Sequence, residues 1–154
     1  MKAKVTVTEL THDELVDILS TALYDCDYLT ADYDTKAWKE IPQDKKHGNC
    51  FEDHLADVLL NDGIIFITDN EANGELYKTP GVPCHLEKPA WWEQGQDDDS
   101  CVVGVYEVNL KAILKACSTP RGYKLLTETL NGEGDYFTAN NLLQIAMFGE
   151  EIYG

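Results

Sequence analysis

Histidine and cysteine side chains gather in one short stretch of this sequence, at a spacing that could serve a metal ion. His47, Cys50 and His54 follow the pattern His-x2-Cys-x3-His, and Cys84-His85 could supply a fourth ligand. Zinc accepts Cys and His together in tetrahedral sites. However, Cys50 and His54 straddle the expected start of a helix, and their spacing matches no zinc-finger pattern. We therefore expect no metal and no cofactor, and we predict a half-buried thiol beside two solvated imidazoles.

A second metal-like pattern is Asp69-x-Glu71-x-Asn73-Gly74, which resembles the first half of a calcium-binding loop. An EF-hand needs a bidentate carboxylate at its twelfth position and a helix on each side. The twelfth position here is Pro80, and both flanks are predicted to be strands. The pattern therefore indicates a hairpin turn.

The sequence contains no recognisable motif for nucleophilic catalysis. The sequence has no GxSxG, no P-loop and no glycine-rich dinucleotide fingerprint, and no spacing pairs one of the five cysteines with a histidine. Neighbouring acids are too frequent in so acidic a chain to indicate acid–base work. We predict that the protein is not an enzyme.

Charge is the unusual property of the chain. It has 28 acidic and 12 basic residues, a formal net charge of −16. Eight acids and no base lie between Lys4 and Lys36, seven acids between Lys46 and Lys78, and five acids after Lys124. Such a field repels nucleic acid phosphates and lipid headgroups and attracts basic proteins. We expect no direct nucleic acid binding, no membrane association, and either a basic protein partner or a purely solubilising role.

Two segments could carry that binding. Trp91-Trp92 lies in a proline-rich stretch just before an acidic run, and tryptophan often anchors interfaces, although it could equally cover the core. Tyrosines alternate with acids from Tyr24 to Asp34, as in a surface loop or a short extended segment. The predicted partner-binding residues are Asp13, Asp17, Asp25, Asp27, Tyr28, Asp32, Tyr33, Asp34, Trp91 and Trp92.

The first half of the chain must position these residues. Thr11-His-Asp-Glu14 is a capping box, and the helix behind it places leucine and isoleucine on one face and Asp13 and Asp17 on the other. A second helix is expected with Asn49 as its cap, followed by a central strand at 64–68 and a hairpin whose second strand is 75–77. A short strand is also expected at 4–8.

The second half shows a long irregular excursion at 79–100 and then a strand at 101–108. Three helices are expected after it: one capped by Asn109 that ends before Pro120, one over 123–130, and one from about Thr138 to Gly149. A final edge strand is expected at 150–153. Helices and strands in this uneven order favour one α+β domain over residues 1–154, with a small, mainly antiparallel sheet and about five helices.

Composition agrees with a single globular domain. The 154 residues suit one hydrophobic core, and the five widely spaced cysteines without a CxxC pair indicate reduced thiols in a cytoplasm. No apolar run is long enough for a transmembrane span, and the N-terminus does not read as a signal peptide.

Three segments, 10–24, 50–60 and 142–154, carry a resemblance to a family. The first begins with Leu-Thr-His-Asp-Glu-Leu, and the third ends with Met-Phe-Gly-Glu-Glu-Ile-Tyr-Gly. They resemble acidic, mostly uncharacterised proteins of gut bacteria, their prophages and conjugative elements. The shared segments are structural helices, so the resemblance implies a setting and transfers no functional residues. Because acidic proteins of such elements include inhibitors of host-defence nucleases, it implies an acidic inhibitor or nucleic-acid mimic that acts on a basic partner. The alternatives are an accessory protein that oligomerises through Trp91-Trp92, and a small metal-dependent enzyme using His47, Cys50 and His54.

Overall fold

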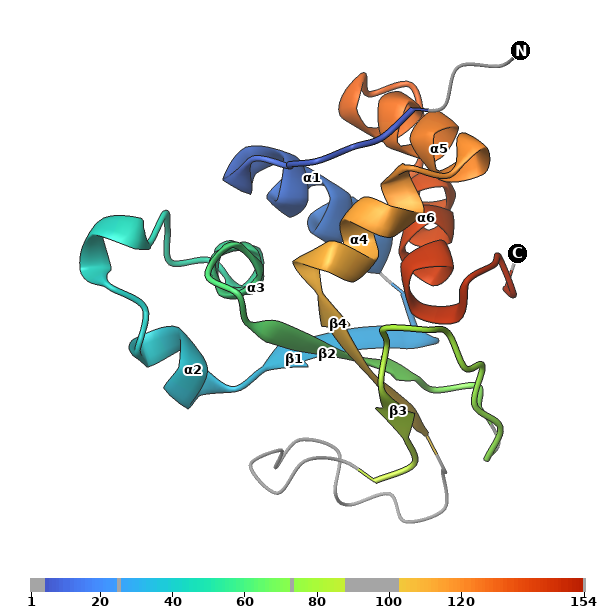
Figure 1. Cartoon of the computed structure of the whole chain (residues 1–154), viewed down its shortest axis with the longest axis horizontal. Helices are drawn as coiled ribbons and strands as arrows, with labels where there is room; N and C mark the ends of the chain where they lie inside the picture. Colours follow the sequence, from blue (N-terminus) through green and yellow to red (C-terminus); the bar gives the residue numbers. More distant parts are fainter. Residues whose placement is uncertain (1–4, 25, 73, 88–102, 154) are drawn as a thin grey trace.

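The computed structural model describes residues 5–24, 26–72, 74–87 and 103–153. These residues form an antiparallel sheet whose strand order is β1-β2-β4-β3, and six α-helices with one short 3-10 turn. Most of the helices lie over one side of the sheet (Figure 1). The expected α+β class is therefore confirmed. None of the described helices is long and apolar enough to cross a bilayer.

The sheet places alternate side chains in the core. Its strands are β1 (Leu29–Tyr33), β2 (Ile64–Asp69), β3 (Cys84–His85) and β4 (Gly104–Asn109). Tyr33 faces Ile65 across β1 and β2, and Ile65 faces Val108 across β2 and β4. Because side chains alternate between the two faces of a strand, one face of these three strands buries a continuous apolar row against the helices. The predicted strand at 64–68 is confirmed as an internal strand.

The helices are held at their starts by side-chain caps. They are α1 (His12–Leu23), α2 (Thr35–Lys39), α3 (Phe51–Leu60), α4 (Leu110–Cys117), α5 (Pro120–Leu130) and α6 (Tyr136–Phe148), with the 3-10 turn η1 at Gln43–Lys45. The Thr11–Glu14 capping box and the Asn109 cap are present as predicted. Gly149 ends α6 in the left-handed conformation, which glycine adopts without steric cost.

Several predicted helix starts were wrong by a few residues. The cap of α3 is Cys50, whose N–H donates to Asp53 Oδ2 at 3.1 Å, where the prediction named Asn49. Thr119 caps α5 with Pro120 in its first turn, since proline needs no hydrogen-bonded N–H there. Asp135 caps α6. The segment 24–34, expected to be a surface loop or a short extended segment, contains β1, and α2 and η1 follow it.

Three predicted strands are not formed in the described residues, and the cause is shared. Val7 N–H in the first segment donates to Ser118 Oγ. Tyr77 N–H in the expected hairpin donates to Tyr106 Oη, and the N–H groups of Ile152 and Tyr153 donate to Gln144 Oε1. A side chain that accepts from a backbone N–H offers that donor an alternative to the hydrogen bonds of a sheet. These segments are therefore coil, although β-rich composition had predicted strands.

Candidate functional site

The exposed side of α1 carries two of the acids that the sequence predicted to bind a partner, Asp13 and Asp17. Leu15, Ile18 and Leu19 bury one side of this helix in the core, and Asp13 and Asp17 therefore project from the other. The Asp13 side chain is 99% exposed. Thr21 Oγ1, one turn further along the helix, donates to Asp17 Oδ1 at 3.5 Å.

Exposed aromatic rings adjoin this stripe. Tyr24, directly after α1, is 73% exposed, and the rings of Tyr136 and Phe137 at the start of α6 lie 4.1 Å apart, each 39% exposed. Ser20, Thr21, Tyr24 and Tyr136 line a shallow hollow between the two helices. We call Asp13, Asp17, Ser20, Thr21, Tyr24 and Tyr136 the α1 face. It combines negative charge with rings that can be buried by a partner, as at interface hot spots.

The other predicted partner-binding residues are placed differently. Asp27 is exposed just after α1, but Asp34 is used as the cap of α2, accepting from Lys36 N. The Tyr33 ring is only 9% exposed and belongs to the core. Tyr28 is half-buried and donates to Asn140 Oδ1 at 3.0 Å. The tyrosines at 28 and 33 thus face inward, and the exposed ring near the acids is Tyr24.

Burial also changes the acid–base properties of Tyr28, Asp32 and Tyr33. It raises the pKa of the Asp32 carboxyl, while the Tyr33 N–H that Asp32 accepts at 2.8 Å acts in the opposite direction. Burial raises the pKa values of Tyr28 and Tyr33 as well. Asp25, Trp91 and Trp92 lie outside the described residues.

The two histidines of the His-x2-Cys-x3-His pattern contact different residues. His54 on α3 stacks on Trp38 with ring centroids 3.9 Å apart, and its Nδ1 contacts Tyr33 Oη at 2.5 Å. Lys46 Nζ lies on the Trp38 ring at 3.9 Å from its centroid. His47 belongs to a different group. His47, Cys50 and His54 thus do not form the set that their spacing suggested.

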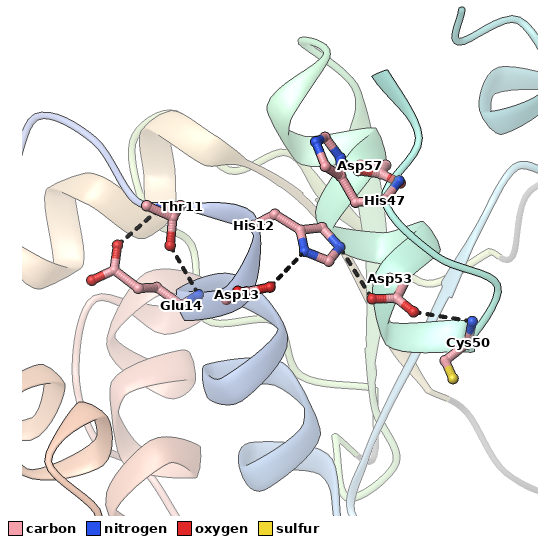
Figure 2. A network of polar contacts seen from close by, with 8 residues as sticks. All are labelled: Thr11, His12, Asp13, Glu14, His47, Cys50, Asp53 and Asp57. Atoms are coloured by element: carbon pink, nitrogen blue, oxygen red, sulfur yellow. Dashed lines mark hydrogen bonds and ion pairs between the residues drawn. The ribbon is translucent and has the colours of Figure 1, made fainter. Parts of the chain in front are cut away.

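His47 instead meets a residue that the sequence analysis did not connect with it. Its imidazole stacks on His12 of α1 with ring centroids 4.8 Å apart. Its Nδ1 is 2.7 Å from Oδ1 of Asp57, and its backbone N–H donates to Asp57 Oδ2 at 2.8 Å. Asp57, on α3, is fully buried. Figure 2 shows these three residues between the start of α1 and α3.

Two further carboxylates flank His12. Asp13 Oδ1 lies 3.1 Å from its Nδ1, and Asp53 Oδ1 lies 3.1 Å from its Nε2 (Figure 2). The Asp53 contact is an ion-pair distance without hydrogen-bond alignment, so Nε2 is buried without a hydrogen-bond partner. We call His12, His47 and Asp57 the histidine cluster. Its one sequence signal was His12 inside the capping box, which gave no indication of His47.

The chain was compared with known proteins in three ways. A scan against protein-family models and searches of curated proteins and of solved structures found no match.

Proposed function

We propose that this chain is an acidic binding protein that engages a basic protein through the α1 face. The observation that carries the proposal is that the acids are largely not paired with lysine or arginine. Among the described residues, the one ion pair involving a lysine or arginine joins Arg121 to Glu151 at 3.0 Å. Lysine and arginine therefore leave most of the described acids, including the exposed Asp13 and Asp17, available to a partner.

The acids and the bases are also separated along the chain. The α1 face lies in the base-free stretch between Lys4 and Lys36, whereas four lysines fall within residues 36–46, on α2 and η1 and just after them. Asp13 and Asp17 are four residues apart, so one helical turn of about 5.4 Å separates them. This spacing is comparable with that of neighbouring phosphates in a nucleic acid strand. It supports a mimic or decoy that occupies the nucleic-acid-binding surface of a basic partner, such as a host-defence nuclease.

A purified basic nuclease is the probe for this proposal, with binding measured by surface plasmon resonance over a range of salt concentrations. We expect affinity to fall steeply with salt, mainly through slower association. The triple change Asp13→Asn, Asp17→Asn and Asp27→Asn should weaken binding at least about tenfold, a loss of roughly 1.4 kcal/mol. Its thermal midpoint should stay close to that of the parent, because exposed carboxylates contribute little stability.

A matched control removes the same charge elsewhere. Glu71, Glu75 and Glu87 are exposed in the segment between β2 and β4, and their change to Gln alters net charge by the same amount. A greater loss of affinity in the Asp13, Asp17 and Asp27 variant than in the glutamate variant supports the proposal. Equal loss in both variants, or none in either, would show that the α1 face is not the binding surface.

A further inference from the structure

The histidine cluster offers three ligand atoms from three places in the sequence. One imidazole nitrogen from His12, one from His47 and one carboxylate oxygen from Asp57 lie within 4.8 Å of one another. His12 is the first residue of α1, and Asp57 is in the middle of α3, two helices that pack against each other. Two of the three ligands are therefore fixed by the core, and the third, His47, comes from the loop before α3.

A neighbouring carboxylate orients the His12 imidazole in the way that metal sites require. A metal-ligating histidine usually donates its other ring N–H to a carboxylate, which fixes the tautomer. Asp13 stands beside Nδ1 of His12 at 3.1 Å, so Nε2 is the nitrogen that would coordinate, in place of its present contact with Asp53 Oδ1 at 3.1 Å. That Nε2 is buried and has no hydrogen-bond partner, and the His12 side chain is only 12% exposed. A buried ring nitrogen without a hydrogen bond is costly unless a ligand satisfies it.

The charge around the imidazoles also favours a cation. Asp57 is fully buried and the Asp53 side chain is 18% exposed. In the part of the chain that the structure describes, both carboxylates contact histidines and neither forms an ion pair with a lysine or an arginine. A buried carboxylate needs hydrogen-bond donors or positive charge beside it, and a metal ion is one source of that charge. A divalent ion would supply the missing positive charge.

We propose that His12, His47 and Asp57 bind a divalent transition-metal ion of the zinc type. Two imidazole nitrogens and one carboxylate oxygen are donors that zinc accepts, with a fourth position left for water or another ligand. Calcium and magnesium prefer sets of oxygen ligands and fit less well. Cys50 is not part of the set, since its sulfur points away from both imidazoles in Figure 2.

Binding requires a small closure of the cluster. Tetrahedral zinc holds its ligand atoms about 3.4 Å apart, so atoms up to 4.8 Å apart must approach. His47 can make this movement because it lies in a loop and its side chain is 50% exposed. The next residue, Gly48, passes so close to Asp53 that a Cβ there would lie 2.2 Å from Asp53 Oδ2. A glycine therefore allows the loop to carry His47 next to α3.

The test uses the full chain, stripped with a chelator and reduced, and titrated with zinc by isothermal calorimetry. We expect one saturable zinc per chain and a higher thermal midpoint with zinc bound. His12→Gln, His47→Gln and Asp57→Asn should each weaken binding at least about tenfold, while keeping the circular dichroism spectrum of the parent. The matched controls are His85→Gln, in which the changed histidine lies beside Glu107, and Cys50→Ser. Both should bind zinc like the parent.

Cobalt serves as a second probe that distinguishes nitrogen and oxygen ligands from thiolates. Cobalt bound to the cluster should give no thiolate charge-transfer absorption, and zinc should displace it. The proposal is overturned by the absence of saturable binding, by unchanged zinc affinity in the His12 and His47 variants, or by loss of binding in Cys50→Ser. It stands apart from the partner-binding proposal, because these substitutions leave Asp17, Asp27 and Tyr24 intact and either result can fail alone.

Discussion

Two carboxylates in the part of the chain that the structure describes are completely buried, and they are satisfied in opposite ways. Asp57 accepts from the backbone N–H of one residue, His47, and also contacts its imidazole, which is half exposed. Asp69, at the end of β2, accepts from groups that are neutral donors: the hydroxyl of Tyr153, at 3.0 and 2.8 Å from its two oxygens, and the N–H of Glu71. Both are 0% exposed, yet only one has an ionisable partner open to solvent.

The surroundings of Asp69 are those of a structural anchor. Gln144 of α6 binds the backbone N–H and C=O groups of Tyr153, and Tyr153 in turn reaches Asp69. Burial raises the pKa values of Asp69 and Tyr153, and it raises that of nearby Tyr106 to about 12. Through these hydrogen bonds, Gln144 and Asp69 hold the C-terminal segment against α6 and the sheet. The comparison teaches that burial alone does not mark a functional carboxylate. A partner side chain that solvent can reach, such as His47 beside Asp57, is the more informative feature.

Removing the two carboxylates should give the largest contrast. Asp69→Ala leaves the Tyr153 hydroxyl and the Glu71 N–H without their acceptor, and we expect a loss of about 3 kcal/mol of unfolding free energy. Asp57→Ala should cost about half as much, roughly 1.5 kcal/mol, because water can reach the half-exposed His47 ring. Denaturant unfolding of both variants in chelator measures this. An equal or larger loss for Asp57→Ala would break the comparison.

A smaller effect should separate two tyrosines whose rings lie 5.5 Å apart. Tyr153 donates to a carboxylate, whereas Tyr28 donates to the amide oxygen of Asn140. Hydrogen bonds to charged groups are about twice as strong, so Tyr153→Phe should cost roughly 1.5–2 kcal/mol and Tyr28→Phe roughly 0.5–1 kcal/mol. Denaturant unfolding of the two variants in the same buffer measures both losses of unfolding free energy. If the two losses agree within error, the carboxylate adds nothing to the Tyr153 bond.

The smallest effect is the dependence of stability on pH through Asp69. The pKa of Asp69 in the folded chain is raised above its ordinary value of 3.8, so the folded state keeps this proton to higher pH than the unfolded state does. The contribution of Asp69 to stability is therefore greatest at low pH and declines as pH rises from 3.8 through the raised value. Asp69→Asn should remove this decline. Unfolding free energies between about pH 4 and pH 6 test it, and an unchanged slope in the variant would refute it.

The sequence by itself determined the elements whose signals are local. The Thr11–Glu14 capping box, the apolar stripe of α1, the Asn109 cap and the β-rich run of β2 each depend on neighbouring residues, and all are present in the structure. The acidic excess and its base-free stretches are likewise properties of the chain alone. The α+β class followed from the order of these elements.

Only the tertiary structure decided which side chains meet. His12 and His47 become neighbours because α1 packs against α3, a contact that no spacing rule encodes, and the same packing separates His47 from His54. Three β-rich segments, around Val7, Tyr77 and Tyr153, remain coil because distant side chains satisfy their N–H groups. The physical reason is common to both cases. Local propensity is worth about 1 kcal/mol or less per residue, and contacts between distant residues readily override it.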